Sequence, residues 1–318
     1  MLLDFFRKVV LKLNTIWQNY QWSRVAHTSH FDPRAPILIT GDPRSGTTWL
    51  TEIIQTIPHS AFLWEPLKVR DVPAFRNLNF GWRQHIPEHA RWPEARDAFE
   101  RLLRGQILNT HTTRQTTREA FQQADRLIVK FVRANALLPW LTNQFAFRHK
   151  PIHLVRHPFA VVSSQLRHGS WDDEYTGFDL FDDPYSEPYR KHRPFLDTIS
   201  SQEEKLTALW CLTNLIPLRH PDRDARWITI HYEHLLLHPR EQLSRLFEQW
   251  KMDMPSGMEN EMRAPSTTTK RGDSVRDSKK QLHHWQSKLD DEQLDRMRRV
   301  LSYFEVEYYG DEALPKTP

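Results

Sequence analysis

The sequence contains the stretch Pro36-Ile-Leu-Ile-Thr40, followed directly by Gly41-Asp-Pro-Arg-Ser-Gly-Thr-Thr-Trp-Leu50, and this stretch decides the fold. Its first half has the apolar run of a short buried strand, and a helical pattern follows from Gly46 to Pro58. Gly41 and Gly46 have the spacing of a phosphate-binding loop, in which backbone N–H groups and a helix N-terminus converge on an anion. The stretch therefore predicts a strand–loop–helix anion site.

The loop lacks the lysine of a nucleotide triphosphatase. Such an enzyme places Lys and then Ser or Thr after the second glycine, for the terminal phosphates and Mg²⁺, whereas this chain has Thr47-Thr48. The cation lies inside the loop instead, as Arg44. Hydroxyl groups and one guanidinium suit a phosphate–sulfate group that is bound without a metal. A P-loop kinase with a degenerate motif stays as the alternative enzyme.

Strand and helix patterns alternate along the rest of the chain. Further apolar runs predict strands at 61–64, 127–132, 152–155 and 227–232, and helical patterns follow two of them at 158–167 and 239–250. This alternation predicts a parallel sheet with helices on both faces. The expected fold is a three-layer α/β/α sandwich of the P-loop-like nucleotide-binding type, with its ligand at the carboxyl ends of the strands.

Composition narrows the functional classes. The 318 residues include 44 Lys and Arg against 40 Asp and Glu, a net charge of +4 with no basic block, so no nucleic-acid partner is expected. The single cysteine, Cys211, forbids an intramolecular disulfide and is compatible with a cytoplasmic protein. No cluster of Cys, His and carboxylates has metal-ligand spacing, so no metal is expected. The sequence does not indicate the oligomeric state.

The first residues predict a helical arm at 1–33, ahead of a main domain at 34–318. Apolar residues recur there at helical spacing, but charges interrupt them before the roughly 20 residues that a bilayer span needs. Packing on the main domain is the favoured interpretation of this helix. Peripheral contact with a membrane surface through its amphipathic face is the alternative.

Two motifs carry a resemblance to a known family. Pro43-Arg-Ser-Gly-Thr-Thr-Trp-Leu50 resembles the 5′-phosphosulfate loop of sulfotransferases that use 3′-phosphoadenosine 5′-phosphosulfate (PAPS). Ile152-His-Leu-Val-Arg-His-Pro-Phe-Ala-Val-Val-Ser-Ser164 resembles the family element that binds the 3′-phosphate. The resemblance implies an enzyme that moves the sulfuryl group of PAPS to an acceptor hydroxyl. A non-catalytic nucleotide-binding protein on the same fold is the alternative from another class.

The resemblance also assigns contacts to the nucleotide. It implies that a guanidinium and a hydroxyl, from Arg156 and Ser164, hold the 3′-phosphate, which agrees with their place at a strand end and on the next helix. A late basic segment resembles the part of the family that closes over the same phosphate, and Trp49 either stacks on the adenine or belongs to the core. The implied donor-binding residues are Arg44, Ser45, Gly46, Thr47, Thr48, Trp49, Arg156, Ser164, Lys270, Arg271 and Gly272.

The residue that acts as the general base differs between branches of the family. Cytosolic members place a His two residues after a strand Lys, but this chain has Lys130-Phe131-Val132. Phe62-Leu-Trp-Glu-Pro66 instead resembles the Phe-Glu-Pro segment of carbohydrate sulfotransferases, which makes Glu65 the predicted general base, with a structural carboxylate as the alternative. His111 is the reserve base. Lys130 either neutralises the leaving phosphate or is structural. Arg44 would neutralise the transferring group.

Two aperiodic segments are predicted to be lids. Residues 169–195 hold seven carboxylates interleaved with aromatic residues, and residues 264–281 are rich in Ser, Thr, Lys and Arg. The carboxylates would repel a polyanion, so we expect a neutral or cationic hydroxylated acceptor. The resemblance favours a sugar hydroxyl, and another small hydroxylated metabolite or an amphiphile is the alternative.

Overall fold

The computed structural model describes residues 2–169, 185–264, 266–267 and 277–316. Its centre is a five-stranded parallel sheet with the strand order β2-β3-β1-β4-β5. The sheet comprises β1 (Ile37–Gly41), β2 (Ser60–Trp64), β3 (Arg126–Phe131), β4 (Ile152–Val155) and β5 (Ile228–His231). The predicted strands are confirmed, each within one residue of its expected ends. The predicted α/β class is confirmed as well.

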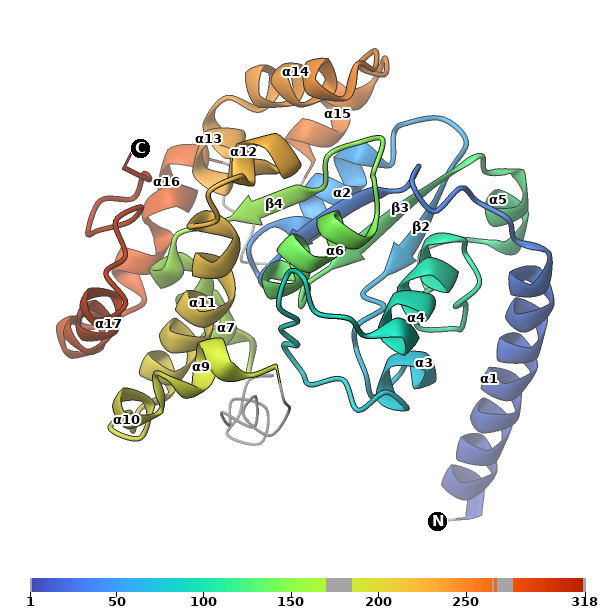
Figure 1. Ribbon diagram of the computed structural model, residues 1–318, viewed down its shortest axis with the longest axis horizontal. Coiled ribbons are helices and arrows are strands. Elements are labelled where there is room, and N and C mark those ends of the chain that lie inside the picture. The colour runs from blue at the N-terminus through green and yellow to red at the C-terminus, as the bar shows by residue number, and fades with distance from the viewer. Residues whose placement is uncertain (1, 170–184, 265, 268–276, 317–318) are drawn as a thin grey trace.

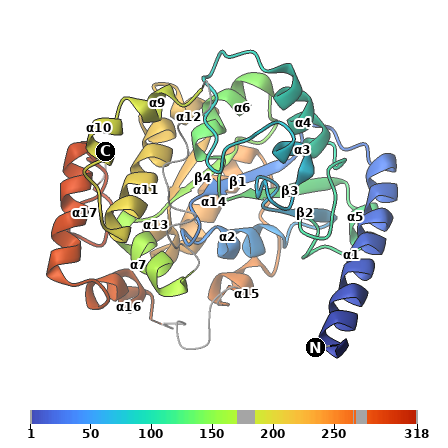
Figure 2. The ribbon, with the colours of Figure 1, turned by 90° about the horizontal axis from the view of Figure 1, so that it is seen from below.

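Helices cover both faces of this sheet (Figures 1 and 2). The helices of the first half are α1 (Leu2–Thr28), α2 (Thr47–Ile54), α3 (Pro73–Arg76), α4 (Pro93–Leu103), α5 (Arg118–Gln123), η1 (Asn135–Leu137), α6 (Leu138–Gln144) and α7 (Pro158–His168). Those of the second half are α9 (Glu187–Arg190), α10 (Arg193–Leu196), α11 (Gln202–Leu218), α12 (Arg223–Arg226), α13 (Tyr232–Leu237), α14 (Pro239–Trp250), α15 (Met258–Arg263), α16 (Ser278–His283), η3 (His284–Ser287) and α17 (Asp291–Tyr303).

The alternation of apolar side chains along the strands separates two cores. On β3, Leu127 and Val129 join a cluster with α4 and α6, whereas Ile128 joins the cluster that packs under α2 and α14. Side chains on a strand point to opposite faces in turn, so one apolar run serves both layers. A third cluster joins α7, α11 and α17 beyond the edge of the sheet and includes Cys211, which is buried as a small apolar residue.

Several helix ends follow from local sequence. Ser201 and Glu204 form a capping box at the start of α11, and Asp290 and Gln293 form another at the start of α17. Pro239 begins α14 at the predicted position, where its missing N–H costs nothing. The helix predicted from Gly46 to Pro58 is shorter than expected, because the chain leaves α2 after Ile54.

The N-terminal helix differs from the favoured prediction. Packing on the main domain holds only for its last part, where Trp22, Val25 and Ala26 are buried. Residues 6–18 are exposed, and Figure 1 shows α1 extending away from the body. This part projects beyond the body and is exposed on every side, and its apolar residues other than Leu11 lie on the opposite side of the helix from the buried three. Among the described residues, no helix combines the length and the hydropathy of a membrane span.

Candidate active site

The loop from β1 to α2 is a cradle that requires both of its glycines. A Cβ on Gly41 would lie 2.6 Å from the carbonyl oxygen of Leu154, and a Cβ on Gly46 would lie 2.5 Å from the ring of Tyr232. Gly46 also has a φ of +96°, which side chains disfavour. No side chain in the described part of the chain caps α2, so the first N–H groups of this helix are available to an anion.

Two arginines meet at this cradle. The Arg44 side chain donates from Nε to the hydroxyl of Ser164 at 3.1 Å, and Arg156 donates to the Arg44 carbonyl at 3.0 Å. The Arg156 guanidinium also lies 4.4 Å from the ring centroid of Tyr232. The structure thus brings Arg156 and Ser164 from β4 and α7 to the loop. Three of the residues predicted to bind the sulfuryl donor, Arg44, Arg156 and Ser164, are therefore joined by hydrogen bonds.

The remaining predicted donor residues have different positions. Ser45 is buried and donates to the Asp42 carbonyl at 2.7 Å, so its hydroxyl stabilises the loop itself. Trp49 is buried and lies edge-on to Tyr232, with ring centroids 6.0 Å apart. That is the position of a core residue, and stacking on an adenine stays a prediction. Lys270, Arg271 and Gly272 lie outside the described residues, as do most of the acidic segment and much of the second predicted lid.

Lys130 joins the loop to the predicted base. Its ammonium lies 3.0 Å from the hydroxyl of Thr48 and 3.1 Å from Oε1 of Glu65. It also lies 3.3 Å from the ring centroid of Trp64, a cation–π distance. Arg133 approaches the other carboxylate oxygen of Glu65 at 3.5 Å. One buried cation therefore contacts both the start of α2 and the candidate base.

The backbone holds Glu65 at the carboxyl end of the sheet. Its N–H donates to the Lys130 carbonyl at 2.9 Å, which continues the β2–β3 pairing by one residue. Its φ is +41°, a conformation that non-glycine residues adopt at a cost of about 1–3 kcal/mol. Such strain persists only where the surrounding contacts impose it. The turn directs the carboxylate toward Lys130 and Arg133.

Burial and charge act against each other in this cluster. Burial disfavours the Glu65 carboxylate, but Lys130 and Arg133 outweigh it, and the pKa of Glu65 is lower than its usual value. Burial lowers the pKa of Lys130 to about 8 and that of Arg133 to about 10, although Glu65 favours both cations. At neutral pH the cluster is one carboxylate between two cations.

His111 lies beside Glu65 in a turn between α4 and α5. Its Nε2 lies 3.2 Å from the backbone carbonyl of Glu65, and its Nδ1 lies 3.6 Å from the carboxylate of Asp71. Burial lowers the pKa of His111, so the ring is neutral at pH 7. The structure thus brings both candidate bases to one place. His157 caps the start of α7, because its Nδ1 accepts from the Phe159 N–H at 3.1 Å.

Sequence reasoning missed a buried ion pair under the loop. Asp42 pairs with Arg83 at 2.7 Å, and both side chains are almost wholly buried. Asp42 also accepts from the amide of Asn214 on α11, and burial raises its pKa. Asp42 could have been singled out from the sequence, since it lies inside the glycine loop at 41–46. Nothing in the sequence singles out Arg83, because residues 77–92 show neither a helix nor a strand period.

Arg133 was missed as well, although it follows Lys130 by only three residues. Its guanidinium lies 3.8 Å from the ring centroid of Trp82, and its Nη1 contacts Glu65. The chain turns after Phe131, so the strand pattern does not give the direction of the Arg133 side chain. The available signal was the position of Arg133 directly after the strand that carries Lys130.

The geometry first defines a class: an α/β protein of the P-loop-like type with an anion cradle at the carboxyl ends of a parallel sheet. The sequence model of the sulfotransferase family matches residues 36–256, more than half of the chain. The chain belongs to the sulfotransferase family. A search of curated proteins found no significant match.

Several solved sulfotransferase structures are similar to this chain at low sequence identity. The sulfotransferase domain from the curacin biosynthetic pathway is 18% identical, with 86% of this chain and 98% of that chain covered and a TM-score of 0.45. Sulfotransferase STF9 from Mycobacterium avium is 12% identical, with 94% and 83% covered and a TM-score of 0.48. Mouse sulfotransferase SULT7A1 complexed with PAP is 14% identical, with 86% and 85% covered and a TM-score of 0.45.

Proposed function

We propose that this enzyme transfers the sulfuryl group of PAPS to an acceptor hydroxyl, with Glu65 as the general base. The observation that carries the proposal is the position of Lys130. Its ammonium lies 3.0 Å from Thr48 at the start of α2 and 3.1 Å from Glu65. A sulfuryl transfer needs a cation at the leaving oxygen and a base at the acceptor, and here the two groups are adjacent.

The donor fits the chemistry of the cradle. The glycine loop and the uncapped start of α2 offer N–H groups to the 5′-phosphosulfate, and Arg44 adds a guanidinium. Arg156 and Ser164 would hold the 3′-phosphate, a group that ATP lacks. The lysine that a kinase uses for the terminal phosphates of ATP is replaced by Thr47. These features favour PAPS over ATP as the nucleotide.

The reaction is a displacement at sulfur. The acceptor oxygen forms a bond to sulfur while the bond from sulfur to the 5′-phosphate oxygen breaks. The acceptor proton passes to the Glu65 carboxylate, and adenosine 3′,5′-bisphosphate leaves with the bonding electrons on its phosphate. Lys130 stabilises the charge that develops on this leaving oxygen. We propose a sugar or another hydroxylated metabolite as the acceptor.

Donor binding would also make Glu65 a stronger base. The lowered pKa of Glu65 keeps it ionised, yet a carboxylate of low pKa has a weak drive to accept a proton. The Lys130 ammonium cannot pair equally well with the Glu65 carboxylate and with the leaving phosphate at the same time. When the ammonium turns toward the phosphate, the pKa of Glu65 rises, because burial still disfavours the charged form.

The test is transfer of labelled sulfate from PAPS to a panel of sugars, phenols and lipids. Glu65→Gln keeps the shape of the side chain but cannot accept the proton, so kcat should fall by about 10²–10⁴. Affinity for adenosine 3′,5′-bisphosphate should stay within a few-fold and need no Mg²⁺. Glu88→Gln is the matched control, because Glu88 is paired with His220 and Arg226 away from the loop.

His111→Ala, measured in parallel, should retain most of kcat. A folded Glu65→Gln enzyme with near wild-type turnover, together with an inactive His111→Ala enzyme, would transfer the role of base to His111. Tight, Mg²⁺-dependent binding of ATP would favour the kinase alternative. Binding of PAPS without transfer to any acceptor would favour the non-catalytic one.

A further inference from the structure

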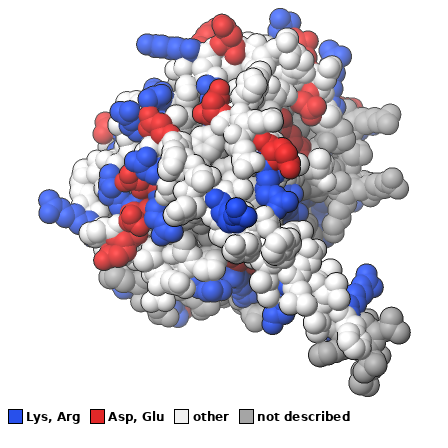
Figure 3. All heavy atoms as spheres, turned by 90° about the vertical axis from the view of Figure 1, so that its right-hand side faces the viewer, with Lys and Arg blue, Asp and Glu red and all other residues white. Residues whose placement is uncertain are grey.

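The outer part of α1 carries a large exposed apolar surface. Residues 6–20 include eight large apolar side chains that are 38–63% exposed. All but Leu11 share one side of the helix, and we call these seven the apolar stripe: Phe6, Val9, Val10, Leu13, Ile16, Trp17 and Tyr20. Figure 3 shows this helix projecting from the body of the molecule, with mostly uncharged side chains along it. Contiguous exposed apolar surface of this kind marks a binding face.

Helix geometry shows that the domain cannot cover this stripe. At about 100° per residue, the seven side chains fall within an arc of about 120°. The residues that anchor α1 to the body, Trp22, Val25 and Ala26, are centred about 180° away from the middle of that arc. The anchoring contacts include Trp22 against Phe121, with ring centroids 6.0 Å apart. The stripe therefore faces away from the protein.

The charge of α1 indicates what covers the stripe. Residues 5–28 contain four Lys and Arg and no Asp or Glu. Arg7 and Lys12 lie beside the two edges of the stripe, where long side chains can reach headgroup phosphates while their stems stay in apolar surroundings. Trp17 and Tyr20 are residue types that concentrate at membrane interfaces.

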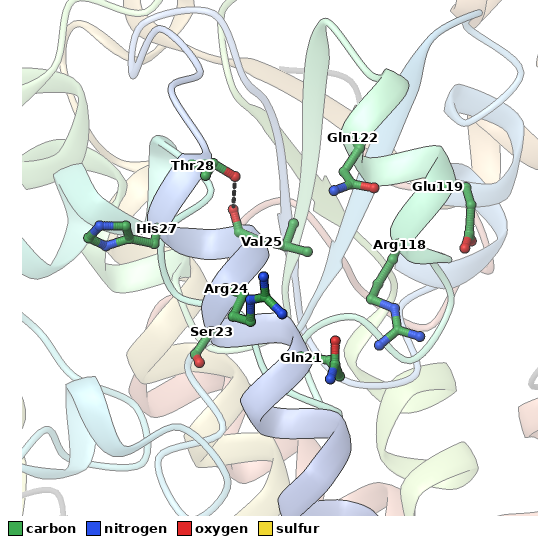
Figure 4. A pocket seen from close by; sticks show the side chains of 9 residues that line it. All are labelled: Gln21, Ser23, Arg24, Val25, His27, Thr28, Arg118, Glu119 and Gln122. Atoms are coloured by element: carbon green, nitrogen blue, oxygen red, sulfur yellow. Dashed lines mark hydrogen bonds between the residues drawn. The ribbon is translucent and has the colours of Figure 1, made fainter.

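The base of the helix continues this positive surface. A hollow of about 810 Å³ lies between α1 and α5, and its walls include Arg24 and Arg118 against one acidic residue, Glu119. Figure 4 shows both guanidinium groups in the space between the two helices, with Gln21 beside them. Arg24 falls on the same side of α1 as the stripe, one turn beyond Tyr20. Cations therefore accompany the stripe from its start to the end of the helix.

We propose that α1 lies flat on an anionic lipid membrane, with the apolar stripe in the boundary between headgroups and acyl chains. Anionic lipid complements the four cations, and an interfacial helix of this composition binds by apolar burial together with electrostatic attraction. A second copy of the chain is the poorer occupant, because each α1 carries four Lys and Arg against one Asp, so two such helices would bring mainly like charges together. The main domain is thereby held at the membrane surface by its N-terminal arm.

The experiment is co-sedimentation of the full chain with vesicles of phosphatidylcholine, with and without phosphatidylglycerol. Leu13→Asp and Leu11→Asp are a matched pair, since the two leucines are 61% and 57% exposed and differ by about 200° around the helix. Leu13→Asp should weaken binding to anionic vesicles about ten- to hundredfold. Leu11→Asp, which changes the charge equally, should lose about fivefold at most.

Both leucines lie outside the core, so the thermal midpoint and the vesicle-free activity of each variant should equal those of the wild type. Equal losses of binding for the two variants, or no binding of the wild type to anionic vesicles, would overturn the proposal. So would a wild-type dimer in sedimentation velocity that Leu13→Asp converts to a monomer, because the stripe would then be an interface between copies.

Discussion

Glu65, Lys130 and Arg133 show how three buried side chains set one another's ionisation. Burial by itself raises the pKa of the Glu65 carboxyl and lowers the pKa of Lys130, which disfavours both charged forms. Their mutual contact at 3.1 Å keeps the carboxylate charged and the pKa of Lys130 near 8. The cluster is therefore cationic by one charge at neutral pH, which suits a site that receives a polyanionic nucleotide.

Lys130→Met should move the acid side of the pH–rate profile. The variant removes a cation that lowers the pKa of Glu65, whereas burial continues to raise it. Since Glu65 must be ionised to act, activity should be lost at a higher pH than in the wild type as the solution is acidified. The measurement is kcat/KM for the acceptor between pH 4 and 8. Lys150→Met is the control, because Lys150 is half-buried and donates to the Asp224 carbonyl, away from Glu65. An unchanged acid limb would separate Lys130 from the ionisation of Glu65.

At the scale of elements, two separate constraints require a glycine at position 46 of the β1–α2 loop. Gly46 needs a positive φ, and its Cα lies against the ring of Tyr232 from the end of β5. Tyr232 is itself fixed by Gln281 of α16, which donates to its hydroxyl at 2.6 Å. The conformation of the proposed donor-binding loop therefore depends on a helix far away in the sequence.

Gly46→Ala should destabilise the protein more than Gly257→Ala. Gly257 has a similar φ of +88° with open space around its Cα, so alanine there costs only the strain of the left-handed conformation, about 1–2 kcal/mol. At Gly46 the collision with Tyr232 adds about 1–3 kcal/mol. Urea unfolding measures the two free energies. Equal losses would show that the Tyr232 ring gives way without cost.

At the scale of the whole molecule, buried neutral histidines lie around the β4–β5 end of the sheet. Burial lowers the pKa of His153, His157 and His231 to about 4 in each case. An unfolded histidine titrates near 6.5. The unfolded chain therefore binds more protons than the folded one between pH 6.5 and 4, and stability falls as the pH falls through this window.

We expect the free energy of unfolding to decrease by up to about 4 kcal/mol per pH unit in that window, since three protons are involved. The buried carboxyls of Asp42 and Glu233, whose pKa values are raised by burial, act in the opposite direction and reduce the slope. Urea midpoints at pH 7, 6 and 5 test this. His157→Gln should reduce the slope, and His89→Gln, at an exposed site, should not. A midpoint independent of pH from 7 to 5 would contradict the expectation.

The sequence by itself determined the local parts of this protein. The glycine spacing at 41 and 46, the apolar runs of the strands and the proline at the start of α14 act within a few residues, so their pattern is visible in the chain. The same holds for Arg156 and Ser164, because a strand end and the next helix fix their separation. The parallel sheet followed from the alternation of these local elements.

Only the tertiary structure decided which distant side chains meet. Lys130 reaches Glu65 because β2 and β3 are neighbours in the register that pairs Trp64 with Lys130, and it reaches Thr48 because β1 is the next strand. Asp42 meets Arg83 through packing that no local period encodes. The exposure of α1 also depends on tertiary packing. The amphipathic pattern was visible in the sequence, but the side of α1 that packs on the body depends on where Trp22 meets Phe121. Contacts across the sheet and between layers depend on strand order and register, which a local pattern does not specify.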